Sequence, residues 1–145
     1  MSTALTMAQR PIDKFVRPLP SQARAVVDFD DFLTQEDFIE LDNDLVRYDS
    51  LTGNTIVLLI LPSLTDTVTL RSYTIEATAL AYFNTWGIGR KETNRGVLIL
   101  LVPSQRQVRI TVGRGLETVL TNETCSLIIQ EQIIPHFKEG AITRG

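Results

Sequence analysis

The sequence is poor in the side chains that most often carry catalysis or bind transition metals. It contains one cysteine, Cys125, and one histidine, His136, among 145 residues. A single cysteine excludes an intramolecular disulfide and a metal site built from several cysteines. A single histidine excludes a histidine-rich metal site, and no nucleophile–histidine–acid arrangement is evident. Cys125 falls within an apolar helical pattern, which predicts a small, inert core residue.

Long apolar runs and an excess of positive charge are also missing. No run reaches the roughly 18 apolar residues of a membrane span. The first residues lack the basic region and apolar core of a signal peptide. The formal net charge of −3 argues against a nucleic-acid partner, because such partners favour a basic surface. We therefore expect a soluble protein, cytoplasmic for the chain as given and exported if a leader has been removed.

The composition is that of a globular domain. Apolar residues make up 43% and charged residues 21% of the chain, which are ordinary values. Its length suffices for one domain with a single core. Residues 1–24 contain three prolines and no sustained period, so we expect a loosely ordered arm with at most a short docking turn at 12–16. Residues 25–145 form the predicted domain.

The apolar pattern predicts alternating strands and helices. In chain order we expect a strand at 24–29, a helix from the N-cap Thr34 to Gly53, a strand at 55–61 and a helix at 68–84. Strands at 97–102 and 107–112 and a last helix from Thr121 follow. The two continuous apolar runs are typical of strands covered on both faces. The short connection at 103–106 predicts a hairpin. This order predicts an α/β fold: a three-layer α/β/α sandwich whose mostly parallel sheet ends in one antiparallel hairpin.

The topology gathers polar and glycine-rich loops at one edge of the sheet. The loops that precede the strands at 55–61 and 97–102 lie at this edge, and so does the loop after the hairpin. We call this edge the signature rim. Glycines are favoured where the backbone takes a positive φ or another backbone comes close. The signature loops and their polar groups contain Trp86, Gly87, Gly89, Asn94, Arg95, Gly96, Gly113, Arg114, Gly115 and Glu117, and Asn122 follows them.

Each polar group on the rim has a functional and a structural interpretation. Asn94 and Asn122 can offer amide oxygens to Ca²⁺ or Mg²⁺, or they can bond a turn and cap a helix. Glu117 can bind the cation, act as a base, or pair with a neighbouring arginine. Arg95 and Arg114 can hold a phosphate through paired donors or remain solvated. For Trp86 we expect a lid over the sheet edge, with its N–H bonded locally.

The opposite, carboxyl edge of the sheet offers a competing site. In open α/β sheets ligands usually bind there. Its acidic residues are Asp28, Asp30, Asp31 and Asp66, which together make an oxygen-rich cation site plausible. Carboxylates are also favoured near a helix N-terminus by the helix dipole, which gives a purely structural explanation. Both edges therefore stay open as cation sites.

Three spaced motifs resemble the signature of the TPM domain family. They are Trp86-Gly87-Ile88-Gly89, the strand start at 94–98, and the segment 112–117 followed by Leu120-Thr121. That family is named for a thylakoid lumen acid phosphatase, a photosystem II repair protein and a modulator of an acetylcholine receptor. The similarity extends from about residue 26 to residue 140. It implies an α/β/α domain, often exported or membrane-tethered, with acid phosphatase activity in some members and divalent-cation binding in several.

The chain departs from the family pattern at two carboxylates. Many members have Asp-Asn-Gly where this chain has Asn94-Arg95-Gly96, and Leu-Thr-Asp where it has Leu120-Thr121-Asn122. Two groups that would help to hold a cation are therefore amides here. The acidic Gly-Asp-Tyr segment near the C-terminus of the family is replaced by residues 140–143.

Three functions fit these observations. The first is a divalent-cation-binding module that acts mainly through contacts with a protein partner, in the maintenance of proteins or membrane complexes. The alternative is a weak, metal-dependent acid phosphatase acting on a phosphate ester, in which the cation polarises phosphate and activates water. The third is a purely structural interaction domain. No residue is assigned as catalytic, and the loss of carboxylates at positions 94 and 122 favours the first function over the second.

Overall fold

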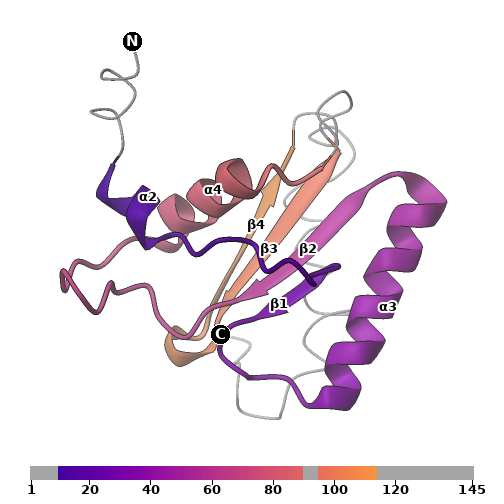
Figure 1. Ribbon diagram of the computed structural model, residues 1–145, viewed down its shortest axis with the longest axis horizontal. Coiled ribbons are helices and arrows are strands. Elements are labelled where there is room, and N and C mark those ends of the chain that lie inside the picture. Colours follow the sequence, from indigo (N-terminus) through magenta and orange to yellow (C-terminus); the bar gives the residue numbers. More distant parts are fainter. Residues whose placement is uncertain (1–9, 90–94, 114–145) are drawn as a thin grey trace.

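The computed structural model describes residues 10–89 and 95–113, which form a four-stranded sheet with helices packed on it (Figure 1). In chain order the elements are α2 (Pro11–Phe15), β1 (Val26–Asp28), α3 (Gln35–Thr52), β2 (Thr55–Ile60), α4 (Ile75–Trp86), β3 (Gly96–Val102), the short 3₁₀ helix η1 (Pro103–Gln105) and β4 (Gln107–Val112). The last predicted helix, with Cys125 and His136, lies outside the described residues.

The sheet has the predicted mixed topology. Its strand order is β1-β2-β3-β4, with β1, β2 and β3 parallel and β4 antiparallel to β3. The hairpin turns through η1 and through Arg106, whose φ is 54°. On β4, Val108 packs on the same side as α3, whereas the Arg109 guanidinium lies 3.9 Å from Glu76 on α4. The predicted α/β class and the antiparallel hairpin are confirmed.

Alternating side chains divide the core into two layers. Every residue of β3 is buried, so the strand contributes to both layers in turn. On one face Leu58 and Ile99 pack with Leu41 of α3, and on the other Leu59 and Leu100 pack with α4. The two crossovers thus lie on opposite faces while the strand order advances in one direction. One of the two crossovers is therefore left-handed, which departs from the usual right-handed rule.

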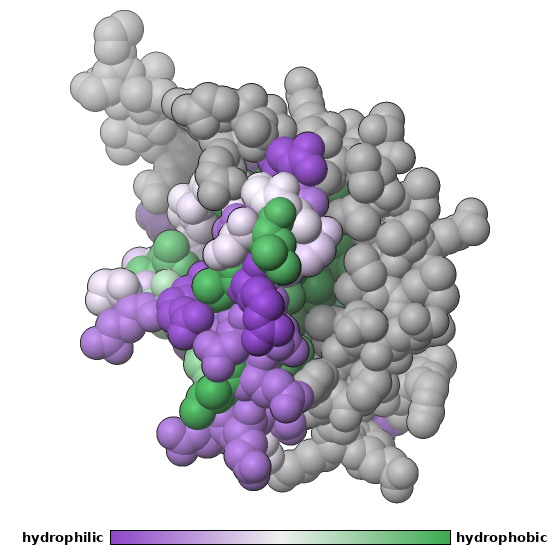
Figure 2. Space-filling view, turned by 90° about the vertical axis from the view of Figure 1, so that its right-hand side faces the viewer, coloured by the Kyte–Doolittle hydropathy of each residue, from purple (hydrophilic) through white to green (hydrophobic). Residues whose placement is uncertain are grey.

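Local capping explains the limits of α3. The Thr34 hydroxyl accepts a hydrogen bond from the backbone N–H of Asp37 at 3.1 Å, as expected of an N-cap. At the other end Gly53 takes a left-handed φ of 78° and donates to the carbonyl of Asp49. Both predicted ends of this helix are confirmed. Its outer face is mainly hydrophilic, with separate hydrophobic residues between the polar ones (Figure 2).

The predicted start of α4 at Val68 is wrong, because the helix begins at Ile75 after the N-cap Thr74. The Asp66 carboxylate accepts from the amide of Val68 at 2.9 Å, and Leu70 has a left-handed φ of 61°. A side chain that captures nearby backbone amides competes with helix formation. The apolar spacing at 68–73 therefore belongs to a loop.

Residues 10–17 pack against α4. Ile12 of α2 is buried, and the Phe15 ring stacks on Tyr73 with centroids 5.3 Å apart. The backbone N–H of Arg17 donates to the Tyr82 hydroxyl at 3.1 Å, and its carbonyl accepts from the Trp86 indole N–H at 2.8 Å. Both the backbone N–H and the carbonyl of Arg17 are thus hydrogen-bonded to side chains of α4.

Candidate functional site

The signature rim is organised around a buried amide. Asn54, only 8% exposed, accepts a 2.6 Å hydrogen bond at Oδ1 from Nε of Arg95 and donates from Nδ2 to the Tyr48 hydroxyl at 3.3 Å. The backbone N–H of Thr55 also donates to the carbonyl of Arg95 at 2.9 Å. The starts of β2 and β3 are therefore joined through both main chain and side chain. A buried amide with its hydrogen bonds made fixes the geometry around it.

Two glycines bring the other rim segments into backbone contact. A Cβ on Gly96 would lie 2.4 Å from the carbonyl oxygen of Ile88, and a Cβ on Gly89 would lie 2.6 Å from the amide of Gly96. The amide of Gly113 donates to the carbonyl of Gly96 at 2.7 Å. Only glycine allows this approach. By contrast, Gly87 ends α4 with a φ of 60° and open space around it.

The indole N–H of Trp86 bonds to a distant segment of the chain and not to a local partner. Its ring lies edge-on to Tyr82, with centroids 5.0 Å apart, and also contacts Phe29. Its N–H donates to the carbonyl of Arg17, which is 69 positions away in the sequence. The prediction of a local partner is wrong, because the segment at residue 17 folds back across α4. The indole fixes that segment in place.

The carboxylate of Asp28, at the carboxyl edge, is engaged by the loop that follows β1. Asp28 Oδ1 accepts from the amides of Asp30 and Phe32 at 3.2 and 3.1 Å, and Oδ2 accepts from that of Leu33 at 2.8 Å. Burial raises the pKa of Asp30, and the negative charges of Asp28 and Asp31 add to this effect. These interactions shape the turn between β1 and α3.

Within residues 10–89 and 95–113, no three histidine, cysteine, aspartate or glutamate side chains come together to hold a metal ion. Asp28, Asp30, Asp31 and Asp66 are all in this range, and a cation site among them stays a prediction. The predicted rim residues Asn94, Arg114, Gly115, Glu117 and Asn122 lie outside the described residues. At the described part of the rim, the Asn54 carbonyl faces a guanidinium, which disfavours a cation at that oxygen.

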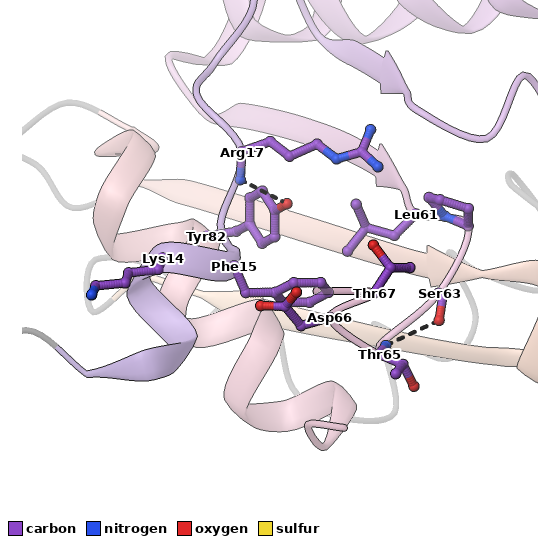
Figure 3. Close-up of a pocket in the computed structure, with 10 residues that line it drawn as sticks. Lys14, Phe15, Arg17, Leu61, Ser63, Thr65, Asp66, Thr67 and Tyr82 are labelled. Carbon is purple, nitrogen blue, oxygen red and sulfur yellow. Dashed lines mark hydrogen bonds between the residues drawn. The ribbon is translucent and has the colours of Figure 1, made fainter. Parts of the chain in front are cut away.

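A pocket of about 210 Å³ opens beside the carboxyl end of β2 (Figure 3). It is lined by Lys14, Phe15, Arg17, Leu61, Pro62, Ser63, Thr65, Asp66, Thr67 and Tyr82. Burial raises the pKa of the Tyr82 hydroxyl, and the hydrogen bond from the Arg17 amide opposes this shift. One sequence prediction touches this pocket, the short docking turn expected at 12–16. It did not indicate which surface the turn would meet.

Comparison with known proteins places the chain in a family. The model of the TPM domain matches residues 26–145, and the chain belongs to the TPM domain family. The described part of the chain has no helix long and apolar enough to cross a membrane. A search of curated proteins finds no match.

Two solution NMR structures have the same fold. The N-terminal domain of a P. gingivalis protein is 31% identical, with a TM-score of 0.64, and the alignment covers 78% of this chain and 68% of that one. The N-terminal domain of a Corynebacterium glutamicum protein is 16% identical, with a TM-score of 0.58, over 79% and 69% of the two chains. The second similarity concerns the fold alone.

Proposed function

We propose that this TPM domain is a divalent-cation-binding module whose signature rim contacts a protein partner. The observation that carries the proposal is the Arg95–Asn54 hydrogen bond, which joins the starts of two strands beside the glycine contacts at Gly89 and Gly96. A binding surface that is ordered in advance loses less conformational entropy when it meets a ligand. The hydrogen bond and the glycine contacts order the described part of the rim in advance, which supports the proposal.

The proposed cation ligands are Asn94, Glu117 and Asn122. Ca²⁺ and Mg²⁺ prefer oxygen ligands, and these side chains supply two amide oxygens and a carboxylate. Asn94 directly precedes Arg95, whose backbone and side chain are both bonded to the start of β2. With one carboxylate in the set, we expect weaker cation binding than in members that keep Asp at positions 94 and 122.

An NMR titration tests the cation site. Ca²⁺ or Mg²⁺ is added to the metal-free, ¹⁵N-labelled full chain, and amide shifts are followed. We expect saturable shifts around Gly96 and Gly113, lost in Glu117→Gln and kept in the control Asp44→Asn, which changes an exposed carboxylate on α3. Asn94→Asp with Asn122→Asp should tighten binding. Shifts centred on Asp28, or no shifts at millimolar ion, would refute the rim site.

The alternative proposal, a weak metal-dependent phosphatase, is supported by the Arg95 guanidinium at the rim, which can offer hydrogen bonds to a phosphate ester. Its Nε already donates to Asn54, so a phosphate would have to bind through other nitrogens or displace that bond. Hydrolysis of an aryl phosphate that disappears in a folded Glu117→Ala variant would support this activity. Activity that persists in the variant would come from elsewhere.

A further inference from the structure

The segment between β2 and α4 carries two large apolar side chains into solvent. Val68 is 88% exposed and Leu70 is 79% exposed, the highest values among the large apolar residues of the described chain. In Figure 1 this segment extends away from the sheet. Scattered surface apolar residues need no special explanation. Here two such residues lie on one short loop, two positions apart.

Hydrogen bonds hold the loop at 66–71 in one shape. The amide of Asp66 donates to the carbonyl of Arg71 at 2.8 Å, and the amide of Leu70 donates to the carbonyl of Asp66 at 2.7 Å. The Asp66 carboxylate accepts from the amide of Val68, and an isolated bridge pairs Thr65 with Ser72 at the base. The exposed side chains therefore sit on an ordered loop.

Leu70 adopts a backbone conformation that its side chain does not favour. Its φ is 61°, in the left-handed region where bulky residues are rare. Asparagine or glycine would take this conformation at lower cost. A leucine at this position is therefore not explained by the backbone conformation of the loop. Backbone strain of this kind is often found at functional sites.

Positive charges lie on the loop and in the pocket beside its first residues, in a chain of net negative charge. Arg71 is on the loop itself and is exposed, and Lys14 and Arg17 line the pocket whose other side includes Asp66 and Thr67 (Figure 3). The pocket lining thus contributes two cations and one carboxylate, Asp66, which is engaged with loop amides, and Arg71 adds a third cation on the loop. Charges act over roughly a Debye length of 10 Å, so this local balance outweighs the net charge of the chain for a surface that touches the loop.

We propose that the loop at 66–71 docks on an anionic lipid surface, with Val68 and Leu70 inserted among the acyl chains. Lys14, Arg17 and Arg71 then meet the lipid phosphates. Apolar insertion combined with basic residues at the interface is the pattern of peripheral membrane binding. The charge complementarity favours a lipid surface over an uncharged apolar pocket in a protein. This site is separate from the signature rim and does not depend on cation binding there.

Vesicle sedimentation tests the proposal. The full chain is mixed with phosphatidylcholine vesicles that contain about one third phosphatidylglycerol, and with vesicles of phosphatidylcholine alone. We expect binding to the anionic vesicles that weakens with added salt. The double variant Val68→Thr with Leu70→Asn removes the apolar groups and suits the left-handed backbone. It should bind at least about tenfold more weakly.

Matched controls separate the loop from general surface effects. Leu51 is 77% exposed on α3, so Leu51→Asn removes a similar apolar group elsewhere and should leave vesicle binding unchanged. The variant Leu70→Trp should show a blue-shifted emission with anionic vesicles, relative to the wild type, whose one tryptophan is Trp86. No sedimentation with anionic vesicles would overturn the proposal and would leave a protein pocket as the surface that these side chains fit. Full binding by the double variant would also overturn it.

Discussion

Nε of Arg95 lies 2.6 Å from Oδ1 of Asn54, which is 41 positions away in the sequence. The bond links the residue before β3 to the residue before β2. Because β2 and β3 are parallel and paired from Thr55 and Gly96 onward, the two side chains stand side by side at one end of the sheet. This pair fixes the described part of the signature rim.

Replacing Asn54 with alanine should destabilise the domain. The substitution leaves Nε of Arg95 without this acceptor, and we expect the free energy of unfolding to fall by about 1–3 kcal/mol. Urea denaturation followed by circular dichroism measures the change. The control Asn43→Ala, at an exposed position on α3, should change stability by less than about 0.5 kcal/mol. Equal effects of the two substitutions would contradict a structural role for the pair.

The close approach of the rim backbones predicts different outcomes at two glycines. In Gly96→Ala the new Cβ meets the carbonyl of Ile88, so we expect a loss of about 2 kcal/mol or more. In Gly87→Ala nothing lies within 4 Å, and only the left-handed backbone is unfavourable. That cost is about 1 kcal/mol. Thermal unfolding of both variants measures the difference, and an equal loss would show that the approach is not tight.

Asp42 is a buried carboxylate that holds the edge strand. It is 6% exposed and accepts from the amides of Ala25 and Val26 at 2.8 and 2.9 Å. Asp42→Ala should cost about 2–4 kcal/mol because both amides lose their acceptor. Hydrogen exchange should also become faster at Val26. Asp44→Ala, at an exposed position of the same helix, is the control and should leave both measurements nearly unchanged.

The raised pKa of Asp30 predicts a pH dependence of stability. The folded protein binds this proton more tightly than the unfolded chain does, so the contribution is present at low pH and is lost as the pH rises through the folded pKa. Above that pH the partly buried charge beside Asp28 and Asp31 lowers stability. Asp30→Asn should therefore be more stable than the wild type at neutral pH, with the gap closing near pH 3. Urea titrations at both pH values measure this, with Asp44→Asn as the control.

Sequence reasoning predicted the fold where one local signal dominated. The continuous apolar runs of β2 and β3 predicted covered strands, and Thr34 and Gly53 marked the ends of α3. It failed at the start of α4, because the carboxylate of Asp66 competes for backbone amides that the apolar spacing assigned to a helix. The apolar residues Val68 and Leu70, which suggested a helix, are exposed side chains on a loop.

For the candidate site, the sequence predicted which loops share an edge of the sheet, but not which side chains bond to each other. The parallel strands imply that Asn54 and Arg95 share an edge, but periodicity does not indicate which side chains bond. The contact of Trp86 with Arg17 joins segments whose packing no local pattern specifies. Nor does the order of residues reveal that the carboxylates of Asp28 and Asp66 accept hydrogen bonds from the amides of their own loops.

The alternation of side chains along β2 and β3 also limits how related chains can vary in length. Adding one residue inside β3 would send each following side chain to the opposite face of the sheet. Both packed layers would then lose their contacts at once, since β3 supplies both. Insertions and deletions among relatives should therefore collect in segments such as 66–71, and the two central strands should keep their length while their apolar residues exchange.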